Sequence, residues 1–249
     1  MQIRYFREYS ENLNRYMEFK MYGHAGKICM VVPTQNNRFY EWEDHGMFDP
    51  VRDVIEDGEI QFIACDSIDP ETWSNQYEPT KDWIRKHENW INYIIYELVP
   101  SVLEKAGKPK EEKLMVTGAS MGATHAANLM LRYPDTFDTL LALSGIYEME
   151  PYYRGYHDDY TYFNNPMAYL SNMPAEHPYI EKYNQSRLIF CVGQGQWEEQ
   201  TQEELRHLAD ILYKKGIHAW TDFWGPDVYH DWPWWQVQLP YFIDVILHR

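Results

Sequence analysis

The sequence predicts an α/β protein in which a mostly parallel sheet has helices on both faces and an antiparallel hairpin at the N-terminus. Short apolar runs typical of buried strands alternate along the chain with longer segments of helical periodicity. That alternation favours parallel strands joined by covering helices. Neither internal repeats nor low-complexity linkers interrupt it, so residues 1–249 are expected to form a single domain.

The hairpin is expected in residues 1–21, where side-chain types alternate on either side of a polar turn. Buried strands are expected at residues 27–32, 59–65, 114–116, 139–143, 188–192 and 219–224. Asp49 and Pro50 are expected to open a short helix, with Asp49 as its N-cap. Longer helices are expected at residues 81–105, 121–133, 198–215 and 232–248. Residues 148–187 are the least regular stretch and are interpreted as a lid or pocket-forming insertion, with one short helix near 166–170.

Composition excludes several classes of function. The 249 residues carry a formal net charge of −16, which opposes binding to nucleic acids or anionic membranes. No apolar run is long enough to span a bilayer, and no secretory signal is visible, so a cytoplasmic location is expected.

The cysteines Cys29, Cys65 and Cys191 lie in strand-like runs without metal-ligand spacing. This pattern favours reduced thiols and predicts neither a metal nor a cofactor. Aromatic residues make up 16% of the chain, and a homo-oligomeric interface is one reading of them.

The segment from Gly118 to Gly122 reads G-x-S-x-G and lies between a predicted strand and a predicted helix. A serine hydroxyl becomes an effective nucleophile when it is exposed beside a base and near donors for an oxyanion. A sharp turn between strand and helix would present Ser120 in this way, and it requires small flanking residues. Ser120 is therefore the candidate nucleophile, and the backbone N–H of Met121 is a candidate oxyanion donor. A helix-capping serine is the structural alternative.

In this chain order the acid and the base of a serine triad follow the nucleophile, in loops after later strands. After residues 188–192 come two glycines and then Glu198 and Glu199, of which Glu198 is the preferred acid. Asp227, in the next loop, is a further candidate. His230 follows the last strand and is the candidate base, with Asp231 beside it as a cap for the final helix.

A second oxyanion donor is expected from the backbone of the loop after residues 27–32, which lies beside the nucleophile in this topology. The candidates there are Gln35 and Asn36.

Several segments resemble the putative esterase family of α/β-hydrolases, which includes esterase D, feruloyl esterases and the antigen 85 acyltransferases. The GASMGA elbow has the family's form, and residues 132–137 are similar to its R-x-P-x-x-F segment. Residues 194–198 resemble the esterase D pattern Q-G-x-x-D, with Glu198 for aspartate as in the antigen 85 branch. Residues 225–235 resemble G-H-x-H-x-W, although Pro226 and Asp227 depart from it, and the loop after Val32 lacks the family's D-G.

The resemblance implies an α/β-hydrolase fold and a serine carboxylester hydrolase that forms an acyl-enzyme on Ser120, with Glu198 and His230 completing a triad. Its expected partner is a small-molecule ester. Two alternatives stay open at this point. An acyltransferase would use the same triad with an alcohol or amine in place of water. A binding protein could keep the fold with a degraded site.

Overall fold

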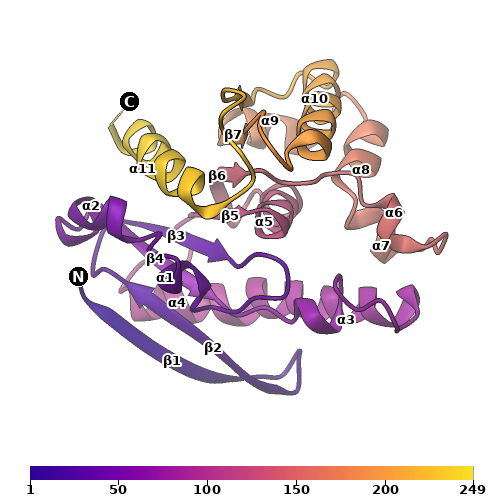
Figure 1. Cartoon of the computed structure of the whole chain (residues 1–249). Helices are drawn as coiled ribbons and strands as arrows, with labels where there is room; N and C mark the ends of the chain where they lie inside the picture. The colour runs from indigo at the N-terminus through magenta and orange to yellow at the C-terminus, as the bar shows by residue number, and fades with distance from the viewer. Residues whose placement is uncertain (249) are drawn as a thin grey trace.

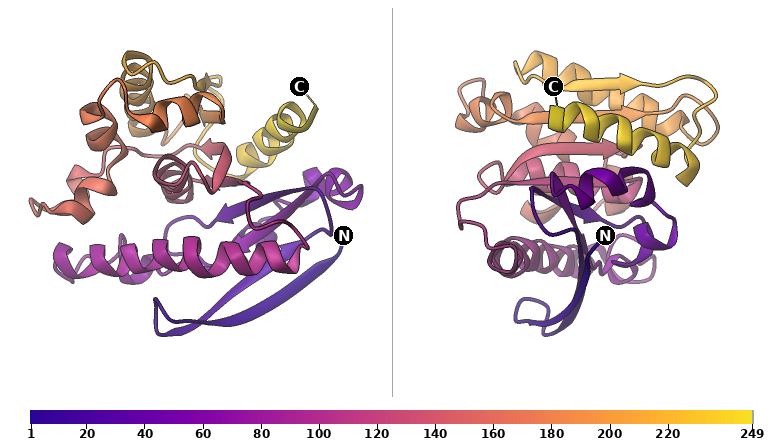
Figure 2. Two further views of the ribbon diagram at one scale, coloured as in Figure 1. Left: turned by 180° about the vertical axis from the view of Figure 1, so that it is seen from behind. Right: turned by 90° about the vertical axis from the view of Figure 1, so that its left-hand side faces the viewer.

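The computed structural model describes residues 1–248, in which eight strands form one sheet in the order β1-β2-β4-β3-β5-β6-β7-β8. β1 and β2 form an antiparallel hairpin, β2 also pairs antiparallel with β4, and all the other neighbours are parallel. The strands are β1 (Ile3–Ser10), β2 (Arg15–Tyr22), β3 (Lys27–Val32), β4 (Ile60–Cys65), β5 (Leu114–Ala119), β6 (Phe137–Leu143), β7 (Arg187–Val192) and β8 (Trp220–Phe223). Figure 2 shows the twist of this sheet and the hairpin extending from one end of it.

Helices cover both faces of the sheet (Figure 1). Each face has its own apolar core. The smaller core lies under α1 (Glu41–Asp44), η1 (Asp49–Val51), α2 (Arg52–Glu56) and α11 (Trp232–His248). The larger core lies under α3 (Thr80–Tyr93), η3 (Ile94–Leu98), α4 (Val99–Lys105), α5 (Met121–Arg132), α8 (Pro166–Asn172), α9 (Pro178–Asn184) and α10 (Glu199–Lys214). The remaining helices are η2 (Asp69–Glu71), α6 (Glu150–Tyr153) and α7 (Asp159–Phe163). This arrangement is the α/β-hydrolase fold that the sequence predicts.

Three local features differ from the sequence prediction. The helix expected at 81–105 is interrupted by one π-helical turn, η3, because Pro100 has no N–H and its ring crowds the carbonyl of the preceding turn. Asp49 is not an N-cap. It lies inside η1 and pairs with Arg52, with Oδ1 2.5 Å from Nη2.

The stretch 148–187 is more regular than expected and contains α6, α7, α8 and α9. These helices have four to seven residues, too few for a periodic apolar pattern to be recognised. Side-chain caps mark the starts of α7 and α8 instead. Asp158 forms a capping box with Thr161, and the side chain of Asn165 accepts a hydrogen bond from the Ala168 N–H.

Strand register brings four chain segments together at one edge of the sheet. Val32 is paired with Gly118, Ala119 with Leu143, and Leu143 in turn with Cys191. The loops that follow β3, β5, β6 and β7 therefore leave the sheet side by side. In sheets of this kind, the carboxyl ends of the strands are where ligands bind and catalytic groups gather.

Cys29, Cys65 and Cys191 are free thiols buried in the sheet, and burial raises the pKa of each one. Across residues 1–248, no helix combines the length and the apolar character needed to cross a membrane.

Candidate active site

Ser120 occupies the turn between β5 and α5 and has a strained backbone, with φ 53° and ψ −128°. Few residues other than glycine adopt such angles, and strain of this kind gathers at functional sites. The Ser120 N–H donates to the Leu143 carbonyl at 2.9 Å, which fixes the turn to the neighbouring strand. Its Oγ makes no hydrogen bond to any other residue of the described chain, so the hydroxyl contributes nothing evident to folding.

The two glycines of the motif are required by close approach of backbone to backbone. A Cβ on Gly118 would lie 2.3 Å from the carbonyl carbon of Gly122. A Cβ on Gly122 would lie 2.4 Å from the Val32 carbonyl oxygen and 2.6 Å from that of Pro33. Because these positions have no side chain, α5 can begin directly against the end of β3. The turn that carries Ser120 therefore lies close to the loop after β3.

Glu198 is fully buried at the start of α10 and is surrounded by donors. Its Oε1 accepts from Ser144 Oγ at 2.5 Å and from the Gly193 N–H at 3.3 Å, while Thr201 Oγ1 donates to Oε2. His230 Nδ1 lies 3.2 Å from the same Oε2. Burial by itself would raise the pKa of the Glu198 carboxyl. The hydrogen bonds and charge around it outweigh burial, with His230 first, and hold that pKa below its usual value.

His230 is held in a defined orientation by its backbone and by an aromatic neighbour. Its N–H donates to the Gln196 carbonyl at 3.1 Å, and its ring meets the Trp235 ring edge-on at 5.1 Å. Trp235 Nε1 in turn donates to Ser144 Oγ at 3.2 Å, so the indole supports the imidazole and the carboxylate together. With Nδ1 turned to Glu198, the Nε2 of His230 is the nitrogen that can exchange a proton with another group.

Within residues 1–248, no hydrogen bond joins Ser120 Oγ to His230. Ser120 follows β5, Ser144 follows β6 and the Glu198 loop follows β7. Ser144 therefore lies at the end of the strand between the two that lead to the hydroxyl and to the carboxylate. Catalytic hydrogen bonds are often long in free enzymes and shorten when substrate binds. The structure therefore brings Glu198 and His230 into contact and sets Ser120 at the same edge of the sheet.

The other candidate acids lie elsewhere. Glu199 and Asp227 are both exposed, in contrast to the buried Glu198. Asp231 directly precedes the last helix, and its Oδ1 accepts from the N–H of Trp232, the first helical residue, at 2.7 Å.

The expected oxyanion donors have different environments. Met121 is the first residue of α5, so its N–H has no acceptor within the helix. The Asn36 N–H donates to Asp69 Oδ2 at 2.8 Å and is already engaged. In the described part of the chain the Gln35 N–H has no acceptor, and Gln35 is exposed. Of the two loop candidates, only Gln35 keeps a free amide.

Sequence patterns did not reveal the residues that support the site. Ser144 could have been noticed, because it directly follows a buried strand, and its φ of 55° shows a second strained serine beside Ser120. Thr201 lies one helical turn after Glu198, and Trp235 lies in an aromatic run, but neither position carries a motif. No three His, Cys, Asp or Glu side chains in residues 1–248 are grouped so that they could hold a metal ion.

The fold and the serine at the strand–helix turn define an α/β-hydrolase of the serine esterase class. The family model described as "Putative esterase" matches residues 21–242. The chain therefore belongs to the putative esterase family. In a comparison with curated protein sequences, none matches the chain.

Solved structures similar to this one include a ferulic acid esterase, at 15% identity with a TM-score of 0.77, covering 99% of this chain and 97% of that one. MPT51 from Mycobacterium tuberculosis is similar at 14% identity with a TM-score of 0.75, covering 99% of this chain and 98% of that one. An S-formylglutathione hydrolase from Agrobacterium tumefaciens is similar at 14% identity with a TM-score of 0.74, covering 99% of this chain and 95% of that one. At such identities the likeness concerns the fold.

Ser144→Ala is expected to lower kcat/KM for ester hydrolysis about tenfold, the usual effect of losing one hydrogen bond to a charged group. Ser144 is among the groups that lower the pKa of Glu198, so its removal raises that pKa. The acid limb of the pH–rate profile should then move to higher pH. Ser186→Ala removes a hydroxyl that donates to the Lys182 carbonyl, away from the site, and serves as the control. An unchanged profile in Ser144→Ala would count against this role.

Proposed function

We propose that this chain hydrolyses carboxylic esters of small molecules through an acyl-enzyme on Ser120, with His230 as general base and Glu198 as the acid of the triad. The observation that carries the proposal is the pairing of two features at one sheet edge. One is a strained serine whose hydroxyl has no hydrogen-bond partner among the described residues. The other is an imidazole paired with a fully buried carboxylate.

In the first half-reaction, His230 Nε2 accepts the proton of Ser120 Oγ as that oxygen attacks the ester carbonyl. Glu198 stabilises the imidazolium that forms and keeps its Nδ1 protonated. The tetrahedral oxyanion accepts hydrogen bonds from the N–H groups of Met121 and Gln35. Cleavage of the C–O bond then releases the alcohol, which takes the proton from His230. Water attacks the acyl-enzyme by the same steps and releases the acid.

We also propose that the segment 148–187 forms a wall of the substrate pocket. Met121, next to the nucleophile, packs in a small apolar cluster with Met149 and Tyr153 from this segment. Trp73, Trp83 and Ile84 complete that cluster. A group held beside Ser120 would therefore meet an aromatic surface.

Release of p-nitrophenolate and acetate from p-nitrophenyl acetate tests this function. We expect multiple turnovers per chain, with nearly all of the acetyl group appearing as acetate even when glycerol is added as an acceptor. Transfer of most of the acetyl group to glycerol would favour the acyltransferase alternative. A folded protein that releases p-nitrophenolate no faster than buffer would favour the non-catalytic alternative and contradict the proposal.

A further inference from the structure

Two buried carboxylates flank the loop that follows β3. Glu41 in α1 is 3% exposed and Asp69 in η2 is 2% exposed. A buried carboxylate is costly unless it is paired or well hydrogen-bonded. Burial raises the pKa of Glu41, and the bonds from Thr34 only partly oppose it. Both carboxylates accept hydrogen bonds from this loop, Glu41 from Thr34 and Asp69 from Asn36.

Together these contacts fix successive peptide groups of the loop. The Thr34 N–H donates to Glu41 Oε2 at 2.8 Å, and Thr34 Oγ1 donates to the other oxygen of the same carboxylate. The Thr34 carbonyl accepts from the Asn37 N–H at 3.3 Å, which closes a turn. The Asn36 N–H donates to Asp69 Oδ2 at 2.8 Å. Pro33 has no N–H, so the Gln35 N–H is the one amide between residues 33 and 37 without an acceptor in the described chain.

The bond to Asp69 acts at the most strained residue of the turn. Asn36 has φ 61°, in the left-handed region that asparagine tolerates better than most residues. The peptide between Gln35 and Asn36 is held at both ends, because the Gln35 carbonyl accepts from Asn37 Nδ2 at 3.1 Å. If the Asp69 bond were lost, this peptide could rotate, and the neighbouring Gln35 amide would no longer keep one direction.

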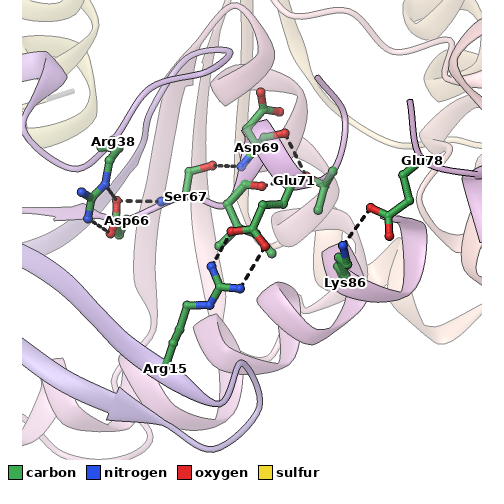
Figure 3. A network of polar contacts seen from close by, with 10 residues as sticks. Arg15, Arg38, Asp66, Ser67, Asp69, Glu71, Glu78 and Lys86 are labelled. Atoms are coloured by element: carbon green, nitrogen blue, oxygen red, sulfur yellow. Dashed lines mark hydrogen bonds and ion pairs between the residues drawn. The ribbon is translucent and has the colours of Figure 1, made fainter. Parts of the chain in front are cut away.

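Asp69 is itself held by several contacts. Its N–H donates to Ser67 Oγ at 3.0 Å, as Figure 3 shows, and Ser74 Oγ donates to its Oδ2. Its other oxygen, Oδ1, has no hydrogen bond within residues 1–248 and lies 4.0 Å from Nε2 of His125, a buried residue of α5. Asp69 therefore lies between the loop after β3 and the helix that begins at the nucleophile.

We infer that Asp69 is a positioning residue that sets the oxyanion hole: by binding the Asn36 amide, it leaves the Gln35 N–H as the free donor directed at the oxyanion. Glu41 binds the Thr34 N–H and so holds the peptide that precedes Gln35. This inference rests on the proposed function. The oxyanion forms in the transition state and is absent from the bound ester. Loss of its donor should therefore lower kcat and leave KM nearly unchanged.

Asp69→Ala tests the inference. We expect kcat for p-nitrophenyl acetate to fall about 30- to 100-fold, with KM within about twofold of wild type. Asp69→Asn keeps an amide oxygen that can accept from Asn36, so it should restore kcat to within about fivefold. Its Nδ2 would then face His125. The control is Glu71→Ala, in the same short helix. The Glu71 carboxylate pairs with Arg15 and not with the loop after β3 (Figure 3). Its kcat should match wild type.

A kcat for Asp69→Ala equal to that of Glu71→Ala would overturn the inference and leave the proposed function standing. A loss expressed mainly in KM would also overturn it, as would a loss in Asp69→Asn as large as in Asp69→Ala. If the alanine variant does not fold, the asparagine variant decides by the same criteria. Failure of the proposed function would look different, because wild-type protein would then show no turnover.

Discussion

Replacing Ser120 with alanine is expected to lower kcat for ester hydrolysis by about 10⁴-fold or more, the range seen when a triad nucleophile is removed. Ser120 Oγ has no hydrogen-bond partner in the described chain, so the change should leave the free energy of unfolding within about 0.5 kcal/mol of wild type. The comparison requires p-nitrophenyl acetate kinetics and chemical denaturation of both proteins.

The matched control for that variant is Ser101→Ala, which removes a hydroxyl that donates to Glu8 at 2.7 Å on a helix away from the site. Its activity should equal that of wild type. Retention of more than a few per cent of activity by Ser120→Ala would show that another group performs the chemistry.

Gly122→Ala is expected to lower the free energy of unfolding by about 3 kcal/mol or more, the upper end of the cost of overpacking. The added Cβ would lie 2.4 Å from the Val32 carbonyl oxygen and 2.6 Å from that of Pro33. Both obstacles are backbone atoms, so no side chain can rotate out of the way. Either β3 or the start of α5 must move.

That movement also affects the site, because Pro33 leads into the loop with Gln35 and the start of α5 carries the Met121 N–H. We therefore expect kcat to fall about 100-fold in whatever protein stays folded. Gly216→Ala is the control, since Gly216 has φ 69° and its added Cβ would have no atom of the described chain within 4 Å. Its cost is left-handed strain alone, about 1 kcal/mol. Equal stability of the two variants would contradict this reading of Gly122.

The strands and the strand–helix turn that carries Ser120 could be predicted because their signals are local in the sequence. Each buried strand is a continuous apolar run, and Ser120 lies between glycines at the end of one. The same chain order led to Glu198 and His230. In the structure His230 Nδ1 lies 3.2 Å from Glu198 Oε2. Of the two neighbouring glutamates, Glu198 is buried and Glu199 is exposed.

The supporting contacts could not be predicted because they join residues far apart in the chain. Ser144 meets Glu198 across 54 residues, and Asp69 meets Asn36 across 33, with no periodic pattern at either end. The loop with Gln35 could be located from topology. The state of its amides depends on where two distant carboxylates lie, which only the folded chain shows. The π-helical turn before Pro100 was missed because the apolar pattern continues through it.

Identification of the residue modified by a fluorophosphonate tests the central claim most directly. Such a reagent is attacked by an activated serine and stays bound to it, and peptide mass spectrometry locates the adduct. The active site described above predicts one adduct per chain, on Ser120, and no adduct after His230→Ala under the same conditions. An adduct on a different residue, or a folded wild-type protein that forms none, would contradict it.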